Sequence, residues 1–176
     1  MNRLKVINLF GGPGSSKSTS AAGLFFKMKM QGYSVELVTE LAKEITWEGH
    51  QNLLSDQLFL FANQNRRLER LRGNVDYVIT DCPILLGLAY TPDNYYQSFS
   101  KLVKEVFDSY QNLNFFVKRD KPYVNAGRNQ TEEEANQVSS KVKQLLYDNL
   151  NFNFFEVLGN SNAPDEILKV IKDYYE

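Results

Sequence analysis

Eight consecutive residues near the N-terminus have the side chains and glycines that bind phosphate groups. The segment reads Gly11-Gly12-Pro13-Gly14-Ser15-Ser16-Lys17-Ser18 and follows the pattern G-x-x-x-x-G-K-[ST] except at Ser16. In such a phosphate-binding loop (P-loop), backbone N–H groups point at phosphate oxygens, and the following helix adds partial positive charge. We expect Lys17 to reach the β- and γ-phosphates of ATP, and Ser18 to ligate Mg²⁺. The residues predicted to contact the nucleotide are Gly11, Gly12, Pro13, Gly14, Ser15, Ser16, Lys17, Ser18 and Thr19.

Ser16 occupies the position at which this pattern has its second glycine. Serine still donates its backbone N–H, but its Cβ crowds a space that glycine leaves open to the phosphates. The departure puts the affinity for phosphate in question more than the mode of binding. An ordinary glycine-rich turn is the alternative, but such a turn does not require Lys17 and Ser18 at the start of the helix.

Two carboxylates directly follow predicted strands. Asp81 closes the third strand and Glu40 closes the second. Ligands of open parallel sheets bind beyond the carboxyl ends of the strands, so both side chains are expected near the P-loop. Asp81 is the candidate to hold Mg²⁺ with Ser18, and Glu40 is the candidate base for an acceptor hydroxyl. The alternatives are a turn cap for Asp81 and a solvated carboxylate for Glu40, with Glu44 as the replacement base.

Four arginines are candidates to stabilise the negative charge that phosphoryl transfer spreads over the phosphate oxygens. Arg66 and Arg70 are four residues apart and share one face of a predicted helix, where they are candidates to contact the acceptor. Arg119 and Arg128 lie in a polar stretch, about residues 118–131, that is expected to form a lid over the phosphates. A solvated surface position is the alternative for each arginine.

Aromatic residues are candidates for the wall of an acceptor pocket, because nucleobases stack on aromatic rings. The segment Tyr90–Phe99 is rich in them, and Trp47 and His50 follow the second strand closely. Surface packing is the alternative for the segment, and a structural role is the alternative for His50. Cys82 is expected to be a small buried residue.

Predicted strands alternate with predicted helices, a pattern that indicates an α/β fold with a parallel sheet and right-handed crossovers. Strands are expected over residues 4–10, 34–39, 75–81, 113–117 and 152–157. Helices are expected over residues 17–30, 41–72 (with a break near Gly49) and 99–110. A further helix is expected to begin at a capping box at 131–134, and the last is expected to begin at residue 162.

Composition limits the class of protein. A chain of 176 residues, 43% of them hydrophobic, predicts a single domain over residues 1–176 with a buried core. The net charge of −1 gives no general attraction to nucleic acid. One cysteine and one histidine exclude an intramolecular disulfide and a Cys/His zinc site. With neither a signal peptide nor a long apolar run, we expect a cytoplasmic protein that has no contact with membranes.

Five blocks of the sequence resemble those of the NadR-like AAA group of small P-loop kinases, and more closely the short kinases of bacteriophages. They are the loop 11–18, Thr39-Glu40-Leu41-Ala42-Lys43, Gln64-Asn65-Arg66-Arg67, Thr80-Asp81-Cys82-Pro83 and Asn125-Ala126-Gly127-Arg128. The resemblance covers nearly the whole chain. It implies a three-layer P-loop fold with a five-stranded parallel sheet in the order 2-3-1-4-5, and ATP as the phosphate donor. Related phage kinases include enzymes that phosphorylate a hydroxymethylated pyrimidine in DNA, such as hydroxymethyluracil.

Three functions are compatible with these residues. The first is an ATP- and Mg²⁺-dependent kinase for a nucleotide-type acceptor, either free or within DNA, in the host cytoplasm if the chain is phage-encoded. The second is a regulatory P-loop NTPase, although the base-recognition motif N-K-x-D is absent from the sequence. The third is a binding module with a decayed site, for which Ser16 is the only indication. A homo-oligomer is left open.

Overall fold

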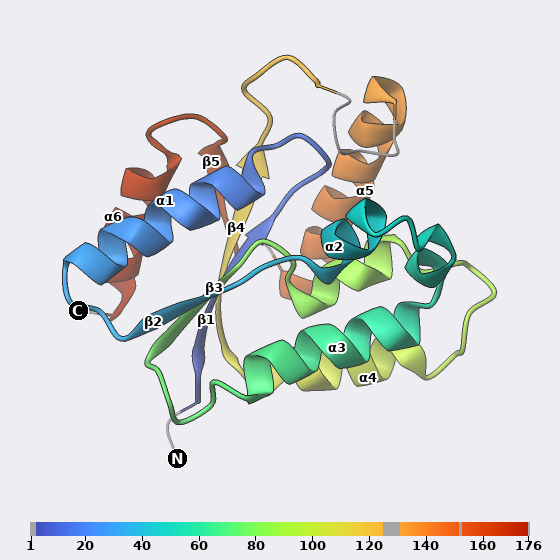
Figure 1. Cartoon of the computed structure of the whole chain (residues 1–176), viewed down its shortest axis with the longest axis horizontal. Coiled ribbons are helices and arrows are strands. Elements are labelled where there is room, and N and C mark those ends of the chain that lie inside the picture. The colour runs from blue at the N-terminus through green and yellow to red at the C-terminus, as the bar shows by residue number, and fades with distance from the viewer. Residues whose placement is uncertain (1–2, 125–130, 152, 176) are drawn as a thin grey trace.

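The computed structural model describes residues 3–124, 131–151 and 153–175. Strands and helices alternate along the chain, as the sequence predicts (Figure 1). The strands are β1 (Lys5–Phe10), β2 (Val35–Val38), β3 (Tyr77–Thr80), β4 (Gln111–Lys118) and β5 (Phe155–Leu158). The α-helices are α1 (Lys17–Met30), α2 (Leu41–Trp47), α3 (Gln57–Glu69), α4 (Phe99–Asp108), α5 (Glu132–Leu150) and α6 (Ala163–Tyr175), with 3-10 helices η1 (Gln51–Ser55) and η2 (Ile84–Ala89).

The five strands form one sheet in the order β2-β3-β1-β4-β5, and every neighbouring pair is parallel. This confirms the predicted three-layer α/β fold and its strand order. Because all strands run the same way, the segments that follow β1, β2, β3 and β4 leave the sheet at one edge. The crossovers that return the chain are long enough to hold a helix, as parallel pairing requires.

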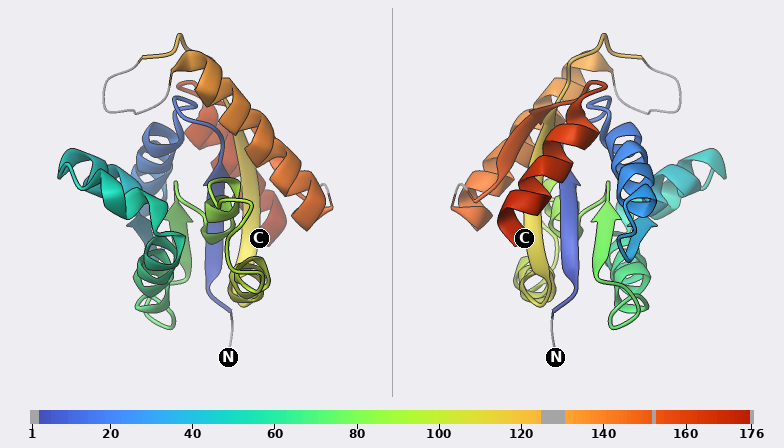
Figure 2. Two further views of the ribbon diagram at one scale, coloured as in Figure 1. Left: turned by 90° about the vertical axis from the view of Figure 1, so that its right-hand side faces the viewer. Right: turned by 90° about the vertical axis from the view of Figure 1, so that its left-hand side faces the viewer.

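The central strand β1 supplies side chains to both faces of the sheet. Val6 and Phe10 belong to the core beneath α3, α4 and α5, whereas Ile7 and Leu9 belong to the core beneath α1 and α6. The two views in Figure 2 show these helix layers over opposite faces of the sheet. Burial on both faces explains why the strand reads as a nearly continuous apolar run.

The predicted helix over residues 41–72 is more interrupted than the sequence indicates. It divides into α2, η1 and α3, and Gly49 has a φ of 75° between the first two pieces. The Asp56 side chain then caps α3 by accepting a hydrogen bond of 3.0 Å from the N–H of Phe59. The chain therefore bends around the carboxyl edge of the sheet before α3 returns it.

The remaining boundaries differ by a few residues. β4 begins at Gln111 and β5 begins at Phe155, against predicted starts of 113 and 152. The capping box of α5 is confirmed, because the N–H of Thr131 donates to Glu134 Oε2 and the N–H of Glu134 donates to Thr131 Oγ1. Across the described residues, no helix is both long and apolar enough to cross a membrane.

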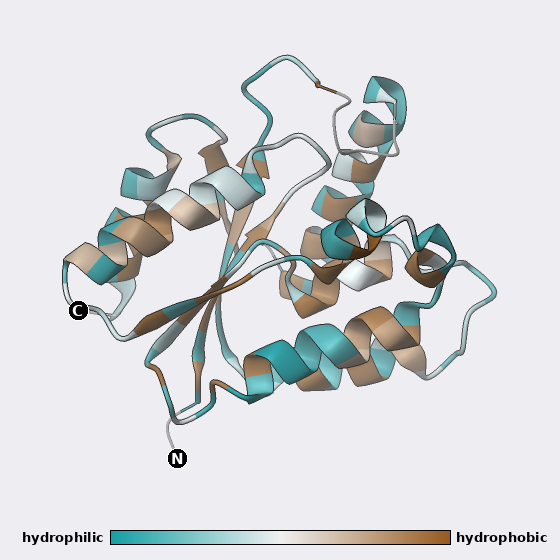
Figure 3. Cartoon of the chain, in the orientation of Figure 1, coloured by the Kyte–Doolittle hydropathy of each residue, from teal (hydrophilic) through white to brown (hydrophobic). Residues whose placement is uncertain are grey.

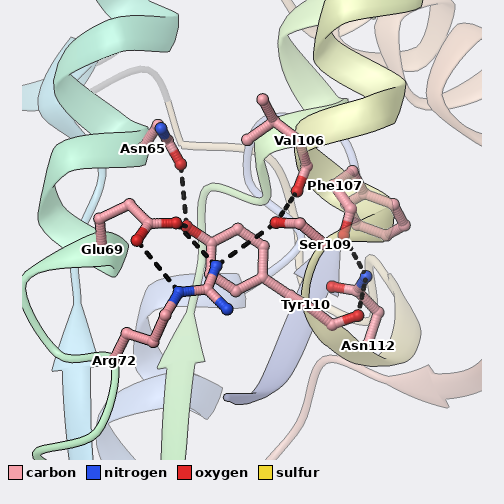
Figure 4. Close-up of polar contacts among 8 residues, drawn as sticks. All are labelled: Asn65, Glu69, Arg72, Val106, Phe107, Ser109, Tyr110 and Asn112. Atoms are coloured by element: carbon pink, nitrogen blue, oxygen red, sulfur yellow. Dashed lines mark hydrogen bonds and ion pairs between the residues drawn. The ribbon is translucent and has the colours of Figure 1, made fainter. Parts of the chain in front are cut away.

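A polar cluster ties the end of α3 to the start of β4 (Figure 4). The Tyr110 hydroxyl donates to Glu69 Oε1 at 2.9 Å, and the Asn65 side-chain amide lies 2.8 Å from the same hydroxyl. Arg72 donates twice to the Glu69 carboxylate and lies over the Tyr110 ring at 4.6 Å. Burial and the nearby Glu69 carboxylate raise the pKa of Tyr110 well above its ordinary value. The cluster holds α3, whose other end faces the candidate site, against the sheet.

The cluster generates a prediction about stability. Tyr110→Phe keeps the buried ring but removes the hydroxyl that Glu69 and Asn65 contact, and we expect the free energy of unfolding to fall by about 1–2 kcal/mol. Urea denaturation with a single probe of tertiary structure measures this change. Tyr96→Phe is the matched control, since Tyr96 is 69% exposed. Equal stability of Tyr110→Phe and wild type would show that the cluster does not hold α3.

Candidate active site

The P-loop joins β1 directly to α1, and its lysine already lies across it. Lys17 Nζ donates hydrogen bonds to the carbonyl oxygens of Gly11, at 2.8 Å, and Gly12, at 3.1 Å. Gly14 has a φ of 79°, a conformation that side chains disfavour. A Cβ at Gly14 would also lie 3.0 Å from the ring of Tyr123. Gly14 therefore allows both the turn of the loop and the close approach of the Tyr123 ring.

The P-loop is packed against a glycine of the β5–α6 connection, Gly159, which the sequence analysis did not identify. A Cβ added at Gly159 would lie 2.1 Å from the carbonyl oxygen of Ser15. The N–H of Gly159 also donates to the carbonyl oxygen of Lys118 at 2.8 Å. Only a residue without a side chain permits this approach of the β5–α6 connection to the P-loop. Its one signal in the sequence is a glycine directly after the fifth strand.

Ser16 adopts the left-handed conformation that glycine favours, with φ 69° and ψ 20°. It stands immediately before α1, and its side chain makes no capping hydrogen bond. The loop thus keeps a backbone geometry that a glycine adopts without strain, at the cost of about 1–2 kcal/mol for a residue with a Cβ. The strain at Ser16 therefore lowers the stability of the loop.

The parallel register of β2 and β3 brings the two predicted carboxylates together. Val38 pairs with Thr80, so Glu40 and Asp81 leave neighbouring strands at the same edge. Glu40 stands at the N-terminus of α2 and is half-buried, whereas the Asp81 side chain is almost fully buried. Burial raises the pKa of Glu40; the nearby Lys17 opposes this, and Asp81 adds to it. Lysine, base candidate and metal-ligand candidate therefore lie within electrostatic reach of one another.

Asp81 has the character expected of a magnesium ligand. Its Oδ1 atom is buried and has no hydrogen-bond partner in the described parts of the chain. An unpaired buried carboxylate oxygen is costly, so a cation at this position would relieve that cost. Ser18 is exposed on the cavity side of the P-loop. Mg²⁺ is commonly bound through one or two carboxylates together with phosphate oxygens, and these residues fit that set.

A cavity of about 410 Å³ extends from the P-loop past Glu40 into the space between α2, η1, α3 and η2. Cys82 lies against it, and burial raises the pKa of its thiol. The amides of Gln57 and Gln64 are also part of the wall, and both residues are buried. The N-terminal half of α3, which is hydrophobic in Figure 3, supplies Leu60 and Phe61 to the lining. Further apolar residues that line it are Leu54, Ile84, Leu86, Phe99 and Val103.

Three of the predicted aromatic residues line this cavity: Trp47, Tyr90 and Phe99. The pKa of the Tyr90 hydroxyl is raised mainly by burial and to a smaller extent by the charge of Glu40. His50 is not among the lining residues, and its side chain is mostly exposed beside Glu48. The predicted pocket wall therefore includes Trp47 and both ends of the segment Tyr90–Phe99.

The arginines of α3 lie elsewhere. Arg66 and Arg70 line a separate depression along α3, with Asn63, Arg67 and Glu69, and are not among the residues that line the cavity. Arg67 donates two hydrogen bonds to the Glu44 carboxylate, at 2.9 and 2.6 Å, and this pairing lowers the pKa of Glu44. Glu44 is also absent from the lining, so the geometry favours Glu40 over Glu44 as a base.

The described part of the predicted lid lies beside the P-loop. Arg119 pairs with Glu132 at 3.3 Å, contacts Asn136, and lies over the ring of Tyr123 at 5.2 Å. Its Cδ atom is 3.8 Å from the position that a Cβ of Gly14 would occupy. Arg128 lies outside the described residues. Arg119 is therefore placed near the bound phosphates expected at the loop, although its guanidinium contacts α5 in this structure.

A family model described as an AAA domain matches residues 6–163, which include the P-loop, both carboxylates and the cavity wall. The chain belongs to this AAA domain family. No curated protein matches the sequence of this AAA domain.

Solved structures show the same fold. The match to thymidylate kinase from Candida albicans has a TM-score of 0.59 and 18% sequence identity. It covers 97% of this chain and 92% of that kinase. The match to thymidylate kinase from Ehrlichia chaffeensis has a TM-score of 0.60 and 20% sequence identity. It covers 97% of this chain and 98% of that kinase. The NadR protein, solved in complex with NAD and AMP-PNP, has a TM-score of 0.70 and 14% identity. It is matched over 97% of this chain but only 49% of its own length, so the chain spans about half of NadR.

The conformation of Ser16 generates a second prediction. Ser16→Gly should raise the free energy of unfolding by up to about 1 kcal/mol, because relief of the left-handed strain exceeds the entropy that glycine adds to the unfolded chain. Chemical denaturation measures the change. Ser140→Gly is the control: Ser140 lies exposed within α5, where glycine should instead destabilise the helix by about 0.5 kcal/mol. Destabilisation by both substitutions would show that Ser16 is not strained.

Proposed function

We propose that this protein is an ATP- and Mg²⁺-dependent kinase that transfers the γ-phosphate to a hydroxyl or phosphate of a nucleotide-type acceptor. One observation carries the proposal: the P-loop, Glu40 and an apolar wall line the same cavity, which is large enough for a second substrate. Its volume of about 410 Å³ is within the usual range for small-molecule sites. A regulatory NTPase has no need of such a chamber beside its phosphates, whereas a kinase must hold an acceptor there.

The chain's own groups account for the transfer. Lys17 exchanges the carbonyls of Gly11 and Gly12 for phosphate oxygens of ATP and stabilises the charge on the transferred group. Glu40 accepts the proton of an acceptor hydroxyl as its oxygen attacks the γ-phosphorus. The partial burial that raises the pKa of Glu40 increases its affinity for that proton. The surrounding apolar wall excludes water, which would otherwise compete as the nucleophile.

Asp81 and Ser18 would hold Mg²⁺ at the P-loop. When bound, the ion supplies positive charge that neutralises the phosphate oxygens during transfer. The predicted lid of this single-domain kinase begins with the described residues 118–124, from which Arg119 reaches the phosphates after releasing Glu132. Arg128 is proposed to act with it.

Two kinds of acceptor fit the proposed reaction. A hydroxymethyl-pyrimidine in DNA is favoured by the resemblance to phage kinases, and a free nucleoside or nucleotide is the alternative. For a DNA acceptor, the modified base enters the cavity while the strand stays outside. Arg66 and Arg70, which lie outside the cavity, are then available for phosphates of the strand.

Transfer of labelled phosphate tests the function directly. ATP labelled at the γ-position is offered with hydroxymethyl-pyrimidine DNA, unmodified DNA, nucleosides and nucleoside monophosphates, and we expect label on at least one acceptor. Lys17→Ala should abolish transfer because the charge on the transferred group is no longer stabilised, and circular dichroism should show that the fold is retained. Hydrolysis of ATP without labelling of any acceptor would favour a regulatory NTPase instead.

The role of Glu40 predicts a change in rate and in pH dependence. Glu40→Gln should lower the rate of transfer to a hydroxyl by about 10²–10⁴-fold while ATP binding persists. Because a base must be deprotonated, the wild-type rate should rise with pH through a pKa above the ordinary glutamate value of 4.5, and the substitution should remove this limb. Initial rates measured across pH check both effects.

Glu36→Gln is the matched control for this measurement. Glu36 lies on β2, the strand that precedes Glu40, but pairs with Lys29 outside the cavity. It should retain both the wild-type rate and the pH dependence. A wild-type rate in Glu40→Gln would refute the assignment of Glu40 as the base.

A further inference from the structure

The charges along the cavity limit what its acceptor end can bind. Among the described residues, no arginine lines the cavity, and the lysines that do so are Lys17 and Lys43. Under the proposed function, Lys17 is engaged by the phosphates of ATP. Arg67 is paired with Glu44, and Arg119 contacts Glu132 and Asn136 on α5.

A phosphate monoester would therefore be poorly accommodated. It carries about 1.5 to 2 negative charges near neutral pH and is usually bound by arginine clusters. Among the described lining residues, the cation left to pair with it is the exposed Lys43, which lies near the Glu40 carboxylate. A poorly paired charge in an apolar cavity is costly, and the Glu40 carboxylate would add repulsion.

The uncharged part of the wall is suited to a planar group. Trp47 lines the cavity while 69% exposed, so its ring is at the mouth and retains free surface for a ligand. Tyr90, which is 41% exposed, lines the same cavity. Deeper in the wall, Gln64 Oε1 is buried and has no hydrogen-bond partner in the described parts of the chain. A ligand N–H would satisfy this acceptor.

We infer that the acceptor group that enters this cavity is a planar heterocycle without a phosphate monoester, and that Trp47 stacks on it and selects for it. The inference rests on the proposed function, because it uses Lys17 and Glu40 to define the donor end. The hydroxyl to be phosphorylated lies at Glu40, and no phosphate on the acceptor is needed for binding. The transfer forms the bond from that oxygen to the γ-phosphorus, breaks the bond to ADP, and leaves the proton on Glu40.

Trp47 also provides the measurement, since it is the one tryptophan in the sequence. Its fluorescence, excited selectively over tyrosine, is followed while uridine, thymidine, cytidine, 5-hydroxymethyldeoxyuridine, adenosine or guanosine is added, each beside its 5′-monophosphate. We expect at least one nucleoside to quench the fluorescence, with an apparent Kd about 10-fold or more below that of its monophosphate. Quenching requires no ATP, so binding is observed independently of catalysis.

Substitution separates stacking from a general effect on the fold. Trp47→Ala should raise the KM for the bound nucleoside, or its Kd by calorimetry, by about 5-fold to 100-fold, because the stacking surface is lost. The KM or Kd for ATP should not change, and Trp47→Phe should recover part of the loss. Phe26→Ala is the control for removing an exposed ring, because Phe26 is 64% exposed on α1 and does not line the cavity.

The outcomes distinguish this inference from the proposed function. Nucleoside-selective quenching without transfer to any acceptor would support the acceptor site and refute the kinase. Monophosphates that bind as tightly as nucleosides and become phosphorylated would overturn the inference and leave the kinase intact. Absence of quenching by every nucleoside, or an unchanged acceptor affinity in Trp47→Ala, would also overturn it.

Discussion

The parallel direction of all five strands is the constraint on which the site depends. It places the segments after β1, β2 and β3 at one edge of the sheet, so that residues distant in sequence become neighbours. Lys17, Glu40 and Asp81 come from these three segments and interact electrostatically. No local preference of the sequence brings them together; the pairing of β1 with β3 and of β3 with β2 does.

The P-loop is held by close packing as well as by its own hydrogen bonds. Gly159 approaches Ser15 from the β5–α6 connection, and a Cβ at Gly12 would lie 2.7 Å from Ser139 on α5. Contacts this tight transmit any displacement of the surrounding elements to the loop. The strained backbone of Ser16 persists within this frame, as strained residues do when the surrounding structure determines their conformation.

The two ends of the cavity have different electrostatic character. The end at the P-loop contains Lys17, Glu40 and the nearby Asp81, whereas the wall formed by η1, α3 and η2 is largely apolar. This asymmetry fits the proposed reaction, in which the donor is rich in charge and the acceptor group is mostly uncharged. The Glu44–Arg67 pair lies outside and joins α2 to α3 across the bend in the chain. Pairing of this kind explains why residues of the right chemical type do not all become part of the site.

The P-loop, the alternation of strands and helices, and the two carboxylates after β2 and β3 could be predicted from the residues alone, because each depends on short spacings and on the ends of strands. The strand order followed from the resemblance. Packing between distant segments establishes that Arg66 and Arg70 do not line the cavity, that Gln57 and Gln64 do, and that Gly159 supports the P-loop. Helical spacing places residues on a common face without saying which face is covered. The face that is covered is set by the packing of α3 against η2 and the sheet. This packing joins segments that are far apart in the chain.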